Sequence, residues 1–210
     1  EIMSIGNSFE QAMMKAVRSV ELGFDTLSVE KYREAPDDEI MEAVGRKDDE
    51  RCFVVYEALY RGLDMEKIWE ATQIDMWFLD KLRHLAVMER DLREKGLSDE
   101  RGMERLAVAR ELGFMDSTIE RLTGEKIPTG RQYASFKMVD TCAGEFKAET
   151  PYFYSTMDKE NEAEIFLDEH KSDKKKILVF GSGPIRIGQG IEFDYCSVHC
   201  AWALKELGYE

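Results

Sequence analysis

The stretch Asp75–Lys95 reads DMWFLDKLRHLAVMERDLREK and decides the fold class. Its larger apolar residues recur at intervals of three or four positions, a spacing that places them on one stripe of a helix. They are Trp77, Phe78, Leu82, Leu85, Met88 and Leu92. The pattern therefore predicts one long amphipathic helix over this range, with Gly96 closing it. Its aromatic side chains are expected to lie in a core, with an exposed patch for a partner helix as the alternative.

Shorter helical patterns lie on both sides of this stretch and predict a mainly α fold. Near the N-terminus, Asn7 and Glu10 have the spacing of a capping box, and Gly23 stops the helix that follows them. The other helices are predicted at about Asp38–Val44, Asp49–Tyr60, Met65–Ala71, Asp99–Leu112, Ser117–Leu122 and Thr129–Phe136.

Three turns between these helices share one sequence pattern. In each, a glycine closes a helix in the left-handed conformation, an apolar residue packs back, and a polar residue caps the next helix. The three turns are Gly62-Leu63-Asp64, Gly96-Leu97-Ser98 and Gly113-Phe114-Met115-Asp116. The intervals between them are unequal, so the sequence predicts short helices joined by tight turns and not a repeat solenoid.

The pattern changes at about Lys137. Extended segments are predicted at Met138–Phe146 and Pro151–Met157, followed by a charged connector over 158–175. The apolar run Lys176–Phe180 is typical of a buried parallel strand. A glycine-rich loop at 181–190 and a helix ending at about Leu207 come next, so these residues predict half of a βαβ unit.

The loop is the sharpest candidate for chemistry. Gly181, Gly183, Gly188 and Gly190 let backbone N–H groups approach an anion at a helix N-terminus. A dinucleotide fingerprint needs a third glycine where Arg186 stands, and no GK[ST] follows. A tight turn whose glycines serve packing is the alternative. Glu192 and Asp194 either stabilise the helix start through its dipole or act in a site.

Cys196 and Cys200 are four residues apart on the same helix, with His199 between them. The two cysteines are expected to be small buried side chains, with metal binding as the alternative.

Composition narrows the functional classes. The net charge of −14 argues against nucleic-acid binding, which depends on Lys and Arg at phosphates. No apolar run approaches the roughly 20 residues of a membrane helix. The four cysteines are scattered, which predicts neither a disulfide framework nor a zinc site and favours a reducing cytoplasm.

Four segments together resemble one family. Gly183–Cys196, GPIRIGQGIEFDYC, is similar to the start of the second ATP-grasp half of the carbamoyl-phosphate synthetase large subunit. Asp140–Phe146 with Tyr154-Ser155-Thr156 resembles the connector before that half, and Ile74–Leu79, IDMWFL, resembles the family's helical oligomerisation domain. Glu1–Gly6 followed by Phe9–Ala12 resembles the end of the first half. These segments occur in family order.

The resemblance implies a division of the chain into four parts. Residues 1–22 would end the first ATP-grasp half, 23–136 would form the helical oligomerisation domain, and 137–175 would be an extended connector. Residues 176–210 would be the first β-α unit of a Rossmann-like pre-ATP-grasp domain, truncated. The chain would thus be a central piece of the large subunit, inactive by itself.

The resemblance also implies a reaction and its residues. The family is an ATP-dependent ligase that makes carbamoyl phosphate from bicarbonate, glutamine-derived ammonia and two ATP, for arginine or pyrimidine biosynthesis. Glu1, Arg186 and Glu192 would line or gate the tunnel that protects carbamate from water. Trp77, Phe78 and Leu82 would belong to the core or interface of the oligomerisation domain.

The same resemblance implies cofactors and partners. The full-length enzyme would use ATP, Mg²⁺ or Mn²⁺, and K⁺, none of them bound by this segment. Its partners would be a small glutaminase subunit and other large subunits, with self-association of this region. Two alternatives remain open: a stand-alone helical interaction module, and a small nucleotide-binding protein that uses the 181–190 loop.

Overall fold

The computed structural model describes residues 2–127, 134–148, 152–181, 183, 188–190 and 192–210. It divides into two compact units. A helical unit spans Ile5–Tyr133, and a C-terminal unit comprises Ala134–Glu210 with the first four residues. Each unit is described by itself below. The mainly α fold class predicted from the sequence is confirmed.

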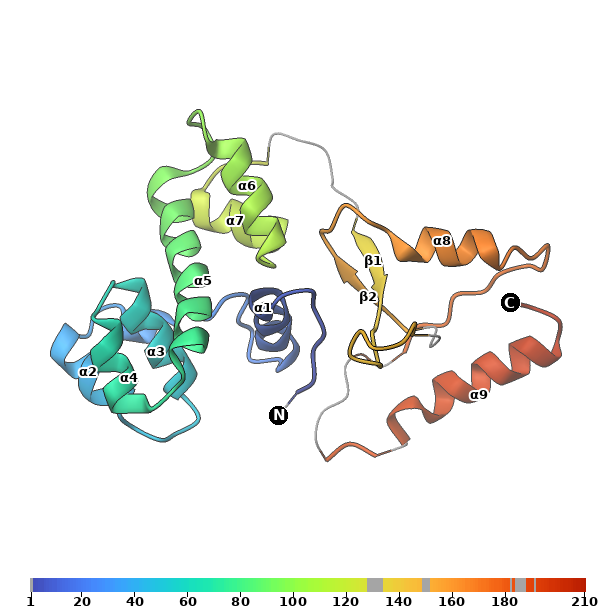
Figure 1. The fold of residues 1–210 in the computed structure, drawn as a ribbon, viewed down its shortest axis with the longest axis horizontal. Helices are drawn as coiled ribbons and strands as arrows, with labels where there is room; N and C mark the ends of the chain where they lie inside the picture. The colour runs from blue at the N-terminus through green and yellow to red at the C-terminus, as the bar shows by residue number, and fades with distance from the viewer. Residues whose placement is uncertain (1, 128–133, 149–151, 182, 184–187, 191) are drawn as a thin grey trace. The chain divides into compact units, whose positions relative to one another are not determined.

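The helical unit is organised around its longest helix, α5 (Met76–Lys95). Figure 1 shows α5 with α2 (Asp37–Val44), α3 (Arg51–Tyr60) and α4 (Met65–Thr72) near its first half. Helices α6 (Gly102–Glu111) and α7 (Asp116–Thr123) lie near its second half. Helix α1 (Phe9–Ser19) packs against α5 and is followed by a loop with one 3₁₀ turn, η1 (Glu30–Tyr32).

The core lies where α5 meets these shorter helices. Leu79, Leu85 and Leu92 of α5 are fully buried. Burial of each leucine side chain stabilises the folded state by about 1.5–3 kcal/mol relative to leaving it exposed. The core also contains the large buried residues Met14, Leu27, Ile40, Tyr56, Ile68, Leu106, Phe114 and Ile119.

The first and last helices of this unit are tied together by polar contacts. Arg18 of α1 donates from Nη1 to the carbonyl oxygen of Gly113 at 2.9 Å. Asp25, in the loop after α1, accepts hydrogen bonds from Thr118 Oγ1 at 3.0 Å and Arg121 Nη2 at 2.6 Å, both on α7. Residues about a hundred positions apart in sequence are therefore neighbours in space.

All three glycines of the predicted turns have positive φ, as the prediction requires, but Gly96 has a ψ of −152° and is not in the left-handed helical conformation predicted for it. Gly62, Gly96 and Gly113 have φ of 73°, 61° and 94°. The predicted caps are confirmed in one turn only. Asp64 caps α4 by accepting from Glu66 N, whereas Ser98 and Asp116 do not cap, because Ser98 bonds Glu125 and Asp116 pairs with Arg110.

The predicted capping box of α1 is shifted by one residue. Ser8, not Asn7, is the N-cap and accepts from Gln11 N at 3.1 Å, while Gln11 Oε1 accepts from Asn7 N at 3.3 Å. Glu10 therefore takes no part in capping the helix. It is only 3% exposed, so its carboxylate lies within the helical unit.

The C-terminal unit contains a small antiparallel sheet. Strands β1 (Ser135–Met138) and β2 (Phe153–Thr156) pair with Ser135 opposite Thr156, and α8 (Glu162–Glu169) packs against β1. The predicted helix Thr129–Phe136 is wrong at its end, because Ser135 and Phe136 belong to β1. Its residues 129–133 lie outside the described part of the chain.

The rest of this unit is loosely packed. Helix α9 (Glu192–Glu206) forms as predicted but buries none of its described residues. The predicted strand Lys176–Phe180 belongs to no sheet of the described residues. Its start bonds only to Glu210, through Ile177 N to Glu210 O at 2.7 Å and Glu210 N to Lys175 O at 3.0 Å, and Leu178 and Phe180 are 78% and 85% exposed. Extended backbone becomes a strand only when a neighbour completes its ladder of hydrogen bonds. The predicted extended segment Met138–Phe146 is mostly turn, with Ala143 and Gly144 at positive φ.

Candidate association surface

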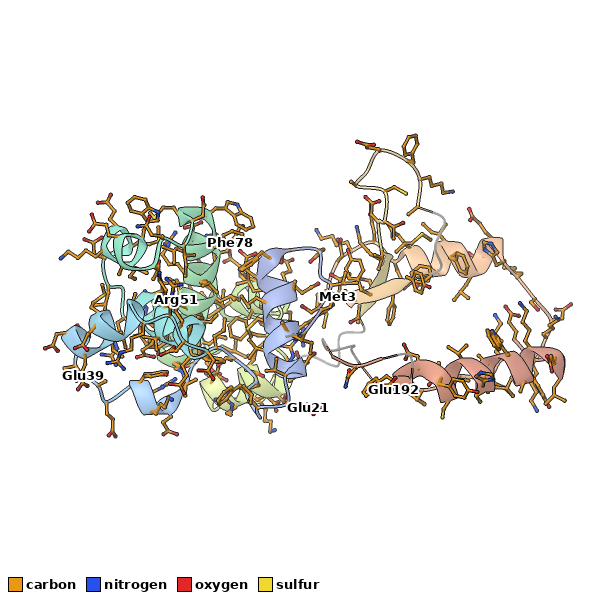
Figure 2. The ribbon with its side chains drawn as sticks, turned by 90° about the horizontal axis from the view of Figure 1, so that it is seen from below. Met3, Glu21, Glu39, Arg51, Phe78 and Glu192 are labelled. Carbon is orange, nitrogen blue, oxygen red and sulfur yellow. The ribbon has the colours of Figure 1, made fainter. Side chains whose placement is uncertain are left out.

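The first turn of α5 presents aromatic side chains to solvent. The Asp75 carboxylate caps the helix by accepting from Trp77 N at 2.8 Å, and this fixes where the helix begins. Leu79 then faces the core with 0% exposure, and Leu82 is 4% exposed. Trp77 and Phe78 fall on the opposite side, 52% and 44% exposed. Figure 2 shows Phe78 at the periphery of the helical unit.

These side chains form one patch with a residue from α1. The ring centroid of Phe9 lies 5.6 Å from that of Trp77 and 5.4 Å from that of Phe78, and Trp77 and Phe78 are 5.0 Å apart, all edge to face. Such pairs contribute about 0.5–1.5 kcal/mol beyond burial and hold the rings in fixed orientations. With the neighbouring Met76, 37% exposed, they are called the aromatic patch below.

A charged network borders the aromatic patch and joins α1 to α5. Glu10 Oε1 lies 3.0 Å from His84 Nδ1 and 3.3 Å from Lys81 Nζ. His84 Nε2 lies 3.3 Å from Asp80 Oδ2, and Lys81 Nζ lies 5.4 Å from the Trp77 ring centroid. Burial opposes ionisation of Glu10, but hydrogen bonds from His84 and Lys81 outweigh it and lower its pKa.

The described glycines of the 181–190 loop are exposed. Gly183 and Gly188 adopt φ of 96° and 91°, a backbone conformation that residues other than glycine rarely adopt. Glu192 begins α9, and its Oε1 accepts from Gly190 N at 3.1 Å, which supports the predicted role at the helix start. Glu1 and Arg186 lie outside the described residues.

The described residues contain no cluster of metal-ligand side chains. No three His, Cys, Asp or Glu side chains in the described ranges converge on a position for a metal ion. The prediction that Cys196 and Cys200 are buried is wrong, because both are exposed free thiols on α9, a helix that buries none of its described residues. None of the described helices combines the length and apolar character needed to span a membrane.

Comparison with known proteins identifies the family. Residues 1–135 match the family described as carbamoyl-phosphate synthetase large chain, oligomerisation domain. Residues 173–210 match the carbamoyl phosphate synthase preATP-grasp domain. The chain belongs to the carbamoyl phosphate synthase large-chain family. The resemblance found in the sequence is therefore confirmed.

Curated members of the carbamoyl phosphate synthase large-chain family align with the whole chain. The large chains of Clostridium acetobutylicum and Agathobacter rectalis are 43% and 46% identical to it, and that of Methanothrix thermoacetophila is 44% identical. Each alignment covers 100% of this chain but only 19–20% of the relative. The chain thus spans about a fifth of the length of the large chains it matches.

The aromatic patch lies within the part of the chain that matches the oligomerisation domain. Of the three residues predicted for its core or interface, Leu82 is in the core while Trp77 and Phe78 are on the surface. Sequence reasoning missed the Glu10–His84 contact, since the two residues are 74 positions apart and neither carries a recognisable motif.

Proposed function

We propose that this chain is the central part of a carbamoyl phosphate synthase large subunit and that its helical region joins large subunits together. The observation that carries the proposal is the aromatic patch within residues matched by the oligomerisation domain. Exposed Trp and Phe side chains held rigidly by one another are the kind of anchor that interfaces favour.

The proposal keeps the four-part division of the chain: 1–22, 23–136, 137–175 and 176–210. The two family matches, over 1–135 and 173–210, support a connector between two domains. The first match includes residues 1–22, so it gives no support to a boundary between 22 and 23. In the whole enzyme, Glu1, Arg186 and Glu192 would line or gate the route of carbamate. The exposed position of Glu192 at the start of α9 is compatible with that role.

The proposed whole protein is a cytoplasmic, glutamine-dependent ligase. It would convert bicarbonate, ammonia delivered by a small glutaminase subunit, and two ATP into carbamoyl phosphate, for arginine or pyrimidine biosynthesis. The described residues offer no converging set of metal ligands. The proposal assigns ATP, Mg²⁺ or Mn²⁺, and K⁺ to the whole enzyme, of which this chain spans about a fifth, and expects no turnover by this chain alone.

Sedimentation velocity over a wide concentration range tests the association. The wild-type chain should show a sedimentation coefficient that rises with concentration. The double variant Trp77→Ala/Phe78→Ala should raise the dissociation constant at least about thirtyfold, as expected for interface anchors. Trp69→Ala is the matched control, because Trp69 is a 41% exposed tryptophan outside the patch, on α4.

Two results would contradict the proposed association: a wild-type chain that is monomeric at every concentration, or a double variant that associates like the wild type. Circular dichroism of each variant establishes that the helices remain folded. The expected inactivity is tested separately by supplying the chain with bicarbonate, ammonia and Mg·ATP. Formation of carbamoyl phosphate, or saturable binding of ATP by calorimetry, would overturn that part of the proposal.

A further inference from the structure

A second feature of the helical unit is a polar pocket on which three arginines converge. The pocket has a volume of about 570 Å³. The loop after α1 and the η1 turn form one side, with Asp25, Thr26, Ser28 and Arg33; Arg93 of α5 and Arg121 of α7 complete the lining. We call it the arginine pocket. It shares no residue with the aromatic patch.

Each guanidinium is held in place by part of its donor set. Arg93 donates from Nε and Nη2 to Glu89 Oε1 at 3.2 and 2.8 Å. Arg121 donates from Nε and Nη2 to the two carboxylate oxygens of Asp25 at 3.2 and 2.6 Å. Arg33 donates from Nη2 to Ser28 Oγ at 2.7 Å and lies 3.5 Å from Glu89. These contacts fix the side chains before any ligand arrives.

The remaining guanidinium donors have no acceptor among the residues that the structure describes. Within the described part of the chain, no hydrogen bond is made by Nη1 of Arg93, by Nη1 of Arg121, or by Nε and Nη1 of Arg33. The three side chains are 32%, 25% and 49% exposed for Arg33, Arg93 and Arg121, so solvent reaches them. Pre-ordered guanidinium donors match the planar or tetrahedral oxygens of an oxyanion.

The residues that line the arginine pocket carry more positive than negative charge. Its lining carries three guanidinium groups against the carboxylates of Asp25 and Glu30, in a chain whose net charge is −14. Glu89, which orients Arg93, is fully buried and also accepts from Tyr56 Oη at 2.9 Å. It therefore stands behind the arginines and does not occupy the pocket.

We propose that the arginine pocket binds a small oxyanion with two or more negative charges, of the phosphoryl or polycarboxylate type. A ligand of this class would bridge guanidinium groups from η1, α5 and α7. It would therefore lock the loop after α1 against the two later helices. Chloride carries a single charge and offers one acceptor atom, whereas a polyvalent oxyanion offers several oxygens to the guanidinium donors.

Isothermal titration calorimetry of the 210-residue chain with sodium pyrophosphate, at ionic strength held constant with NaCl, tests this proposal. Saturable binding at one site is expected. Arg33→Gln and Arg121→Gln should each weaken it about tenfold or more, because each removes charge-assisted hydrogen bonds. Arg46→Gln is the matched control: Arg46 pairs with Glu42 on the exposed face of α2 and does not line the pocket.

A parallel titration with citrate shows whether the pocket binds polycarboxylates as well as phosphoryl compounds. Binding of both anions means that the pocket recognises oxyanions generally, and binding of pyrophosphate alone restricts it to phosphoryl groups. The proposal is overturned if neither anion binds saturably, or if Arg46→Gln weakens binding as much as the pocket variants. It is equally overturned if folded Arg33→Gln and Arg121→Gln, checked by circular dichroism, bind like the wild type; if one variant fails to fold, the other decides.

Discussion

Tyr56 and Glu89 form the most deeply buried polar pair of the helical unit. Tyr56 Oη donates to Glu89 Oε2 at 2.9 Å, and both side chains are fully buried. Burial raises the pKa of the Tyr56 phenol well above its ordinary value, and the neighbouring Glu89 carboxylate reinforces the effect. The phenol therefore acts only as a hydrogen-bond donor, and the carboxylate depends on it.

Tyr56→Phe should accordingly lower the free energy of unfolding by about 1.5–3 kcal/mol, because Glu89 Oε2 loses its partner inside the core. Tyr60→Phe on the same helix is the control. The Tyr60 hydroxyl makes no hydrogen bond with the described residues, so a change within about 0.5 kcal/mol is expected. Urea unfolding followed by circular dichroism measures both, and equal losses would show that the Tyr56–Glu89 bond contributes nothing specific.

Glu10 predicts a pH dependence of stability. Its pKa is lowered from the ordinary value of 4.5 in the folded chain. The ionised carboxylate therefore stabilises the fold above pH 4.5, and this contribution is lost as the pH falls through the lowered pKa. Glu10→Gln should cost about 1 kcal/mol at pH 7, and the cost should shrink as the wild type becomes protonated.

Urea unfolding at pH 7 and at successively lower pH measures this difference. Glu111→Gln provides the control, since Glu111 is exposed at the end of α6 and makes no side-chain hydrogen bond or ion pair with the described residues. It should show a difference near zero throughout. A Glu10→Gln penalty that grows as the pH falls would be inconsistent with the lowered pKa.

At the scale of elements, glycines at helix ends differ in what surrounds them. Gly96 after α5 and Gly124 after α7 both have positive φ, 61° and 71°. A Cβ at Gly124 would meet empty space, whereas one at Gly96 would overlap Glu125 Oε1. That carboxylate cannot move freely, because it accepts from Leu97 N at 2.9 Å and also from the Ser98 hydroxyl.

Gly124→Ala should therefore cost about 1–2 kcal/mol, the conformational penalty alone. Gly96→Ala should cost more, by at least about 1 kcal/mol, for two reasons. Its φ of 61° and ψ of −152° lie in a region that almost only glycine adopts, and the added Cβ also displaces the Glu125 hydrogen bonds. The midpoints and slopes of urea unfolding curves compare the two variants, and equal losses would contradict this prediction.

Local sequence signals located most helices but not their long-range contacts. The predicted ranges of α2, α4, α5 and α7 agree with the structure to within one residue at each end. The start of α6 was predicted at Asp99 but lies at Gly102, because the Asp99 carboxylate is engaged by Arg105 and by Arg101 N in the preceding turn. Local sequence does not show which of several possible partners a side chain bonds, so it could not predict this helix start.

The candidate surface shows the same limit. Periodicity put Trp77 and Phe78 on the apolar stripe of α5, yet the neighbouring Leu79 faces the core. Two adjacent apolar residues and a third beside them are compatible with more than one rotation of the helix, and tertiary packing decides between these rotations. The convergence of Arg33, Arg93 and Arg121 comes from three separate elements and has no local signal at all.

At the scale of the whole molecule, packing differs sharply between elements. Helix α5 buries six of its residues, whereas α8 and α9 bury none of their described residues. Backbone hydrogen bonds that are not covered by a packed core open easily. Hydrogen–deuterium exchange of the 210-residue chain should therefore leave the amides of α3 and α5 protected longest and those of α8 and α9 exchanging fastest among the helices. Comparable protection of α5 and α9 would contradict this expectation.

The contacts from Arg18 to Gly113 and from Asp25 to α7 have a mechanical consequence. The polypeptide leaves this neighbourhood after Asp25, builds five helices and a 3₁₀ turn, and returns to it at α7. A tension applied to the two ends of this excursion is therefore borne by the bonds where they meet and by α5, on which α1 and α7 both pack. The turns that join α2, α3 and α4 lie outside this path, so we expect insertions or deletions there to leave the spacing between α1 and α7 unchanged.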